Sequence, residues 1–154
     1  FEMSPFKNNY LKSVILHDSL TDILVSLNRI DIIIFYYEYI KKEYSCTPGF
    51  ATKNLNGFFD LIKNQNLDNI YILTHVNKIG YEMNPSQKIV EEIILNTNIK
   101  IICMSVLASG FLNFQEALDY IVSLNTNNNL STVIGCSTKK HILEYVNYTS
   151  SNKF

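Results

Sequence analysis

The chain of 154 residues is 47% hydrophobic and 18% charged, and its formal net charge is −1. A near-neutral charge without a basic cluster excludes the electrostatic attraction on which most nucleic-acid-binding proteins depend. No apolar run reaches the roughly 20 residues that a membrane-spanning helix needs. The sequence also contains no charged segment followed by an apolar one, which is the pattern of a secretory signal.

The length fits one domain over residues 1–154, with residues 149–154 as a tail. The three cysteines Cys46, Cys103 and Cys136 are odd in number and form no CxxC pair. A disulfide framework is therefore not expected, and we predict a cytoplasmic location. The chain begins with Phe1 rather than Met, which indicates processing or excision from a longer protein.

Short apolar runs rich in Ile and Val alternate with amphipathic segments along the chain. Five runs show little polar alternation and are predicted as buried parallel strands: residues 13–17, 30–36, 69–74, 99–105 and 131–135. A weaker strand candidate, residues 44–50, contains Pro48 and Gly49, which are unusual inside a sheet.

The segments between these runs carry helix-start signals. Four N-caps are predicted from residue types that favour this position: Ser19 for a helix over residues 19–28, Asn84 for 88–95, Asn113 for 114–124 and Ser137 for 138–146. The alternation of strands and helices predicts an α/β fold with parallel β/α units.

Two arrangements of such units stay open, a doubly wound open sheet and an incomplete (β/α)8 barrel. At about 30 residues per unit, the chain holds five or six units and not the eight of a closed barrel. Neither GxGxxG nor GxxxxGK[ST] occurs, so the usual sequence support for a nucleotide-binding open sheet is missing.

Three consecutive pieces cover about the last half of the chain: "DNIYILTHVNKIGYEMNPSQ" (68–87), "IKIICMSVLASGFL" (99–112) and residues 114–148 with a G-x-S/T turn. In order and spacing they resemble the sixth, seventh and eighth units of an aldo-keto-reductase-like TIM barrel. Upstream, residues 46–62 loosely resemble the fifth strand and helix of that superfamily. Residues 29–39 stand where it has a strand that ends in the catalytic His.

The resemblance implies a TIM-barrel portion, oxidoreductase activity and NADP as a cofactor. The catalytic Asp, Tyr and Lys of the superfamily come from earlier units, and no residue of this chain is assigned to those roles. The chain is also similar to relatives in which the barrel is kept and the reductase tetrad is not.

Barrels bind ligands at the carboxyl ends of their strands, and phosphate often lies after the last two strands. Two turns rich in small residues follow the predicted strands 99–105 and 131–135, and the second turn opens a helix whose amides and dipole favour an anion. We predict that these turns bind the phosphate of a small molecule or of NADP through six residues: Ser109, Gly110, Gly135, Ser137, Thr138 and Lys139. The alternative is a tight turn with an ordinary helix cap.

His17 and His75 fall at the carboxyl ends of predicted strands, and Glu38 follows the predicted strand 30–36. Imidazole and carboxylate groups suit general acid–base catalysis, so these three are predicted catalytic residues. The alternative is that the histidines are rim or core residues bonded to backbone. Asn77 and Lys78 follow His75 in the next loop. They either line the ligand site at the carboxyl ends of the strands or are solvated loop residues. The sequence places no third ligand beside the histidines, so no metal site is predicted.

The predicted function is a reductase-related barrel domain that binds a phosphate-bearing small molecule. The alternative is a non-catalytic partial barrel that assembles with another copy or with an N-terminal partner chain, because five or six strands leave unpaired sheet edges. A third hypothesis is a piece whose active residues lie in a missing N-terminal part.

Overall fold

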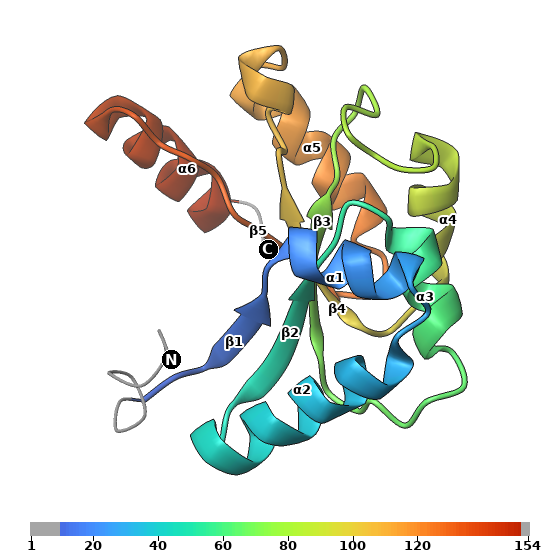
Figure 1. Cartoon of the computed structure of the whole chain (residues 1–154). Coiled ribbons are helices and arrows are strands. Elements are labelled where there is room, and N and C mark those ends of the chain that lie inside the picture. The colour runs from blue at the N-terminus through green and yellow to red at the C-terminus, as the bar shows by residue number, and fades with distance from the viewer. Residues whose placement is uncertain (1–9, 152–154) are drawn as a thin grey trace.

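The computed structural model describes residues 10–151, which form one parallel sheet with helices against it (Figure 1). The strands pair in the order in which they occur along the chain: β1 (Ser13–Leu16), β2 (Thr47–Ala51), β3 (Tyr71–His75), β4 (Lys100–Met104) and β5 (Leu130–Thr132). This order never reverses, as it does in a doubly wound sheet. The predicted α/β fold of incomplete, barrel-like β/α units is confirmed, and the described residues contain five such units.

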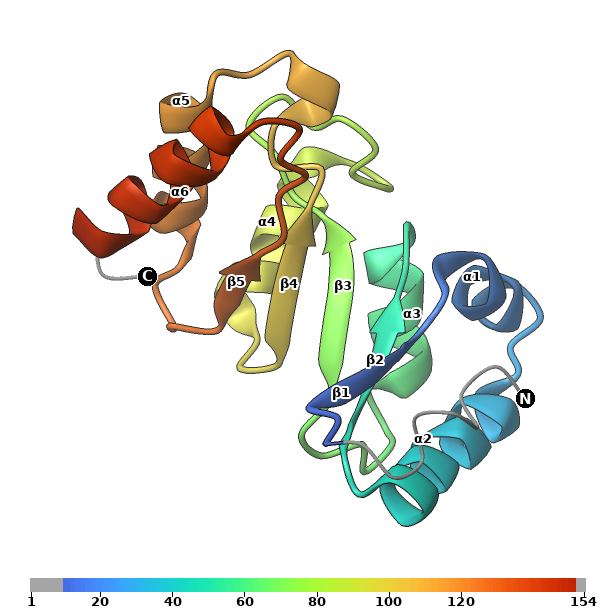
Figure 2. The ribbon, with the colours of Figure 1, turned by 90° about the vertical axis from the view of Figure 1, so that its left-hand side faces the viewer.

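Six α-helices follow the strands within residues 10–151: α1 (Asp18–Ser26), α2 (Ile30–Tyr44), α3 (Leu55–Ile62), α4 (Gln87–Asn96), α5 (Phe114–Leu124) and α6 (Lys139–Ser151). Right-handed crossovers between sequential strands collect the helices on one face of the sheet. In the view of Figure 2 the strands lie in front of α3 and α4. The face of the sheet that points away from these helices, hereafter the open face, is therefore turned toward the viewer. α6 packs on α5, where the Tyr148 hydroxyl donates to Asp119 at 2.7 Å.

The core lies between the sheet and the helices. Strand residues alternate between the two faces, and the register places one apolar side chain of each strand in a row under the helices: Leu16, Phe50, Ile72, Ile101 and Leu130. Phe50, Ile72 and Ile101 are fully buried. The row is closed from above by helix residues such as Phe58, whose ring centroid lies 5.1 Å from that of Phe50.

The prediction of a strand over residues 30–36 is wrong, because this segment is the first half of α2. The buried residues of α2 are Ile33, Tyr37 and Ile40, which recur at the spacing of one helical face. The β-branched run favoured a strand locally, but burial of that face against the sheet decides the conformation. These residues are therefore not a counterpart of the strand that ends in the catalytic His of aldo-keto-reductase-like barrels.

The weaker strand candidate at residues 44–50 is confirmed as β2, at Thr47–Ala51. Pairing of β2 with β3 begins only at Gly49, so Pro48, which lacks an N–H, precedes the first residue pair of that ladder. Gly49 is required by space, since an added Cβ would lie 2.8 Å from Cγ1 of Ile15 on β1.

The predicted N-caps differ from the observed ones by at most two residues. Asn113 is the N-cap of α5 as predicted, and its side chain accepts from the Glu116 amide at 2.9 Å. The other caps are shifted, with His17 in place of Ser19 at α1 and Ser86 in place of Asn84 at α4. At α6 the hydroxyl of Thr138, and not that of Ser137, accepts from the amide of His141.

α6 continues to Ser151, into the segment predicted as a tail, and residues 152–154 lie outside the described part. Among the helices of residues 10–151, none has the length and apolar character needed to cross a bilayer.

We expect Ile72→Ala to lower the free energy of unfolding by about 2–5 kcal/mol, because it leaves a cavity in the row beneath the helices. Urea unfolding followed by circular dichroism measures the change. Leu143→Ala on α6, where the side chain is half exposed, is the control and is expected to change it by about 0.5 kcal/mol or less. Equal effects of the two substitutions would contradict the assignment of the core.

Candidate functional site

A pocket of about 400 Å³ lies at the carboxyl ends of β4 and β5. Two turns that are far apart in sequence form its wall, one after β4 and one before α6. Four of the six residues predicted to bind phosphate line it: Ser109, Gly110, Gly135 and Ser137. The structure therefore brings both predicted turns together around one space.

The other two predicted phosphate ligands do not line this pocket. Thr138 caps α6 with its hydroxyl, and Lys139 is the first residue of that helix. His141 lines the pocket instead, and its Nδ1 lies 3.5 Å from the Ser137 hydroxyl. Sequence analysis missed His141, although a residue four positions after Ser137 lies on the same side of a helix.

The turn after β4 adopts an unusual backbone conformation, which explains its small residues. Ser105, Ala108, Ser109 and Gly110 all have positive φ, at 54°, 46°, 58° and 88°. Side chains with a Cβ are strained there by about 1–3 kcal/mol each, and such strain concentrates at ligand sites. The Gly110 amide donates to the Leu107 carbonyl at 2.9 Å, so it is engaged within the turn and the Ser109 hydroxyl is the better placed donor.

His75 ends β3 and lies beside this turn. Its side chain is 6% exposed, and Nδ1 lies 2.9 Å from the Ser105 hydroxyl and 3.2 Å from a Glu82 carboxylate oxygen. Nε2 is buried and has no hydrogen-bond partner among the described residues. Burial lowers the pKa of His75, and the nearby Glu82 carboxylate only partly opposes this. His75 is therefore a neutral imidazole near neutral pH.

The contacts of His75 limit the chemistry available to it. A catalytic triad needs the nucleophile on one imidazole nitrogen and the carboxylate on the other. Here Ser105 and Glu82 both contact Nδ1, so a triad relay is not built. The arrangement can instead exchange a proton between the Ser105 hydroxyl and Nδ1. Because Ser105 also lines the pocket, it connects His75 with that space.

Charged side chains from neighbouring loops surround this pair. Lys53, after β2, lies 3.5 Å from a Glu82 oxygen. One carboxylate oxygen of Asp22 on α1 accepts a hydrogen bond from the Thr52 hydroxyl, and the other accepts one from the Lys53 amide at 3.1 Å. Helix α1 and the loops after β2 and β3 are thus tied together at one end of the sheet. Sequence analysis missed Glu82 because it is seven residues past its strand, in a loop without a periodic pattern.

The other predicted mouth residues do not join this cluster. His17 is largely exposed and serves as the N-cap of α1. Glu38 is exposed midway along α2 rather than at a strand end, so its predicted place at the mouth is wrong. Asn77 is buried and exchanges two hydrogen bonds of 2.8 Å with the Tyr81 backbone. Lys78 pairs with Glu116 at 2.6 Å, so neither loop residue contributes to the pocket.

The pocket fits one phosphate group better than a whole dinucleotide. Its polar lining consists of hydroxyl groups, turn backbone and His141, and the part of the chain that the structure describes contributes no Lys or Arg to it. NADP would use such a site for a phosphate group only. Within residues 10–151, no three His, Cys, Asp or Glu side chains are grouped closely enough to hold a metal ion.

Comparison with known proteins adds no relative to this picture. No protein-family model matches the chain, and neither curated proteins nor solved structures give a significant match. The assignment of a function therefore depends on the geometry of the site.

We expect the free energy of unfolding to fall as the pH decreases from about 7.5 to 5.5. The unfolded chain protonates His75 near its ordinary pKa of about 6.5, whereas the folded chain resists protonation, so the unfolded state binds more protons in this window. Urea titrations at several pH values measure the slope.

His75→Gln, which stays neutral at every pH, should reduce this slope. His17→Gln is the control, because the exposed imidazole of His17 is not buried on folding. An unchanged slope in the His75 variant would contradict a buried, neutral His75.

Proposed function

We propose that the pocket after β4 and β5 binds the phosphate group of a small organic molecule, in a reductase-related barrel-type domain. The observation that carries the proposal is the convergence of the Ser109–Gly110 and Gly135–Ser137 turns on one space. Barrel proteins place ligands at this edge and often bind phosphate after their last strands.

The electrostatic surroundings of the pocket also favour an anion. The N-terminus of α6, a helix of 13 residues, follows Gly135 and Ser137 directly, and the first amides of a helix carry partial positive charge. The hydroxyls of Ser109 and Ser137 add neutral donors, and the imidazole of His141 adds a ring N–H. No carboxylate is among the described residues that line the pocket.

His75 and Ser105 are the groups that we propose for proton transfer from a ligand in this pocket: Ser105 would take the proton of the ligand and pass its own hydroxyl proton to Nδ1 of His75. Ser105 reaches the pocket and is hydrogen-bonded to the neutral imidazole of His75, which can accept a proton without first losing one. The proposal includes oxidoreductase chemistry with NADP, which is supported by the sequence resemblance to aldo-keto-reductase-like barrels. The proposed location is the cytoplasm, in agreement with the free thiols of Cys46, Cys103 and Cys136.

Gly135→Val is expected to weaken phosphate binding at least about tenfold, because its side chain would enter the pocket. An added Cβ at Gly135 meets no atom within 4 Å, so the variant should fold normally. Isothermal titration calorimetry with NADPH and with glycerol 3-phosphate measures the affinities. Ser123→Ala on α5, outside this pocket, is the control. Failure of both ligands to bind at millimolar concentration would contradict the proposal.

The open face of the sheet supports a second candidate function, assembly with another copy of this chain. Ile15, Leu73, Ile102 and Met104 alternate onto this face and are half-buried rather than covered. Among the described residues, β1 and β5 each pair with one strand only, so both sheet edges remain available.

We expect native mass spectrometry at micromolar concentration to detect a dimer if this second function holds. Ile102→Lys should then shift the distribution to monomer, because a buried charge in the contact is unfavourable. Lys88→Gln on an exposed part of α4 should leave the distribution unchanged. A purely monomeric wild-type chain would overturn the assembly function without affecting phosphate binding.

A further inference from the structure

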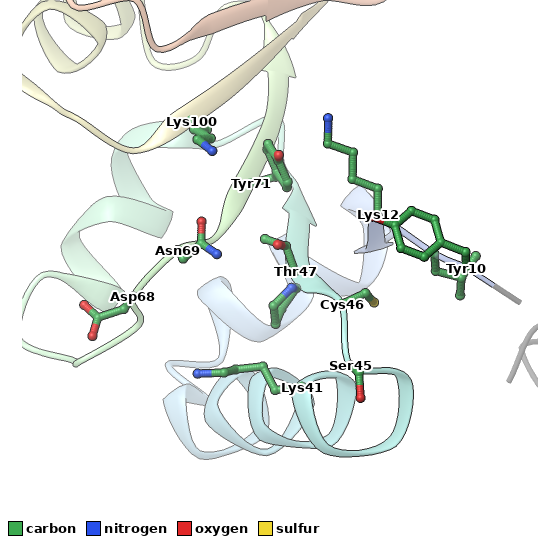
Figure 3. A pocket seen from close by; sticks show the side chains of 12 residues that line it. Tyr10, Lys12, Lys41, Ser45, Cys46, Thr47, Asp68, Asn69, Tyr71 and Lys100 are labelled. Carbon is green, nitrogen blue, oxygen red and sulfur yellow. The ribbon is translucent and has the colours of Figure 1, made fainter. Parts of the chain in front are cut away.

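A second pocket, of about 600 Å³, lies at the opposite end of the sheet (Figure 3). Part of its wall is formed by the first residues of three neighbouring strands, Thr47, Tyr71 and Lys100. The segment before β1 and the end of α2 complete it. Because parallel strands have their amino ends at one edge and their carboxyl ends at the other, this pocket is separate from the one proposed to bind phosphate.

Positive charge is concentrated in this second pocket. Lys12, Lys41 and Lys100 line it, whereas Asp68 is the one carboxylate among its described lining residues. The chain as a whole has a formal net charge of −1, so this excess of cations is local. Since like charges repel, three ammonium groups around one hollow are stabilised when an anion occupies it.

Within residues 10–151, none of the three lysines forms an ion pair, and the ammonium groups of two of them also make no hydrogen bond. Among the described residues, neither Lys12 nor Lys100 forms an ion pair, whereas Lys53, Lys63, Lys78, Lys88 and Lys140 do. Lys41 donates to the Tyr37 hydroxyl at 3.0 Å and lies 4.7 Å from the centroid of that ring. Lys41 is therefore held on its own helix, and Lys12 and Lys100 are the cations available to a ligand.

An aromatic ring lies beside one of these two cations, Lys100. The ammonium group of Lys100 is 5.6 Å from the centroid of the Tyr71 ring, a distance at which a cation is attracted to a ring face. In Figure 3 the ammonium groups of Lys12 and Lys100 lie on either side of Tyr71. Leu11, Pro48 and Tyr10 add apolar and aromatic lining, which an inorganic ion would not contact.

We propose that this pocket binds an organic diphosphate of nucleotide size, with Lys12 and Lys100 on the phosphate oxygens and Tyr71 against the organic part. Lysine binds phosphate as a compact point charge and needs no fixed bidentate geometry. The volume of about 600 Å³ lies in the range of small-molecule sites. The site is independent of the proposed function at the carboxyl ends of the strands.

Calorimetric titration of the full chain with ADP, adenosine and inorganic diphosphate tests the proposal. We expect ADP to bind more tightly than either fragment, and Lys12→Gln or Lys100→Gln to weaken ADP binding at least about tenfold. Lys88→Gln, which removes an equal charge from an 85% exposed side chain on α4, should leave the affinity for ADP unchanged. ADP binding that persists in Gly135→Val, in which the first pocket is blocked, belongs to this site and not to the first pocket.

Three results would overturn the proposal. The first is no ADP binding at millimolar concentration, and the second is an equal loss of affinity in the Lys88 and Lys100 variants, which indicates unspecific charge attraction. The third is equal affinity for ADP and inorganic diphosphate, which excludes a contact between Tyr71 and the organic part. Circular dichroism of each variant verifies that the chain is folded.

Discussion

A row of apolar side chains, one from each strand, crosses the sheet beneath the helices and fixes the register of the five strands. Leu16, Phe50, Ile72, Ile101 and Leu130 form this row. A slip of one residue in any strand would turn its row member onto the open face and expose it. The same register brings His75 level with Met104, and therefore beside Ser105 in the following loop. The packing of the core thus determines the geometry of the candidate site.

The two ends of the sheet offer different chemistry. At the carboxyl ends the pocket is lined by hydroxyls, strained backbone and His141, with the buried His75 behind Ser105. At the amino ends the polar lining includes lysine ammonium groups and the Tyr71 ring. The first pocket would discriminate by short, directed hydrogen bonds, whereas the second would attract by charge and be weakened by salt. Ligands of the two sites are therefore expected to differ in their sensitivity to ionic strength.

The protonation state that His75 favours is determined by its burial and not by its residue type alone. The imidazoles of His17 and His75 both follow apolar strands, yet one is exposed at a helix start and the other is enclosed. Desolvation disfavours the charged form of the enclosed ring. The protonation state of His75 is thereby coupled to folding, and proton exchange with Ser105 depends on the intact loop after β4.

The sequence by itself determined the alternation of β/α units, the position of four strands, the N-cap Asn113 and the two small-residue turns at Ser109–Gly110 and Gly135–Ser137. These features are local, because hydrophobic period, caps and turn residues act within a few positions of the chain. Only the tertiary structure decided that residues 30–36 are helical, that the two turns share one pocket, and that Glu82 and Ser105 meet at His75. Such contacts join residues from different loops, and their formation depends on strand order and register, which no local pattern encodes.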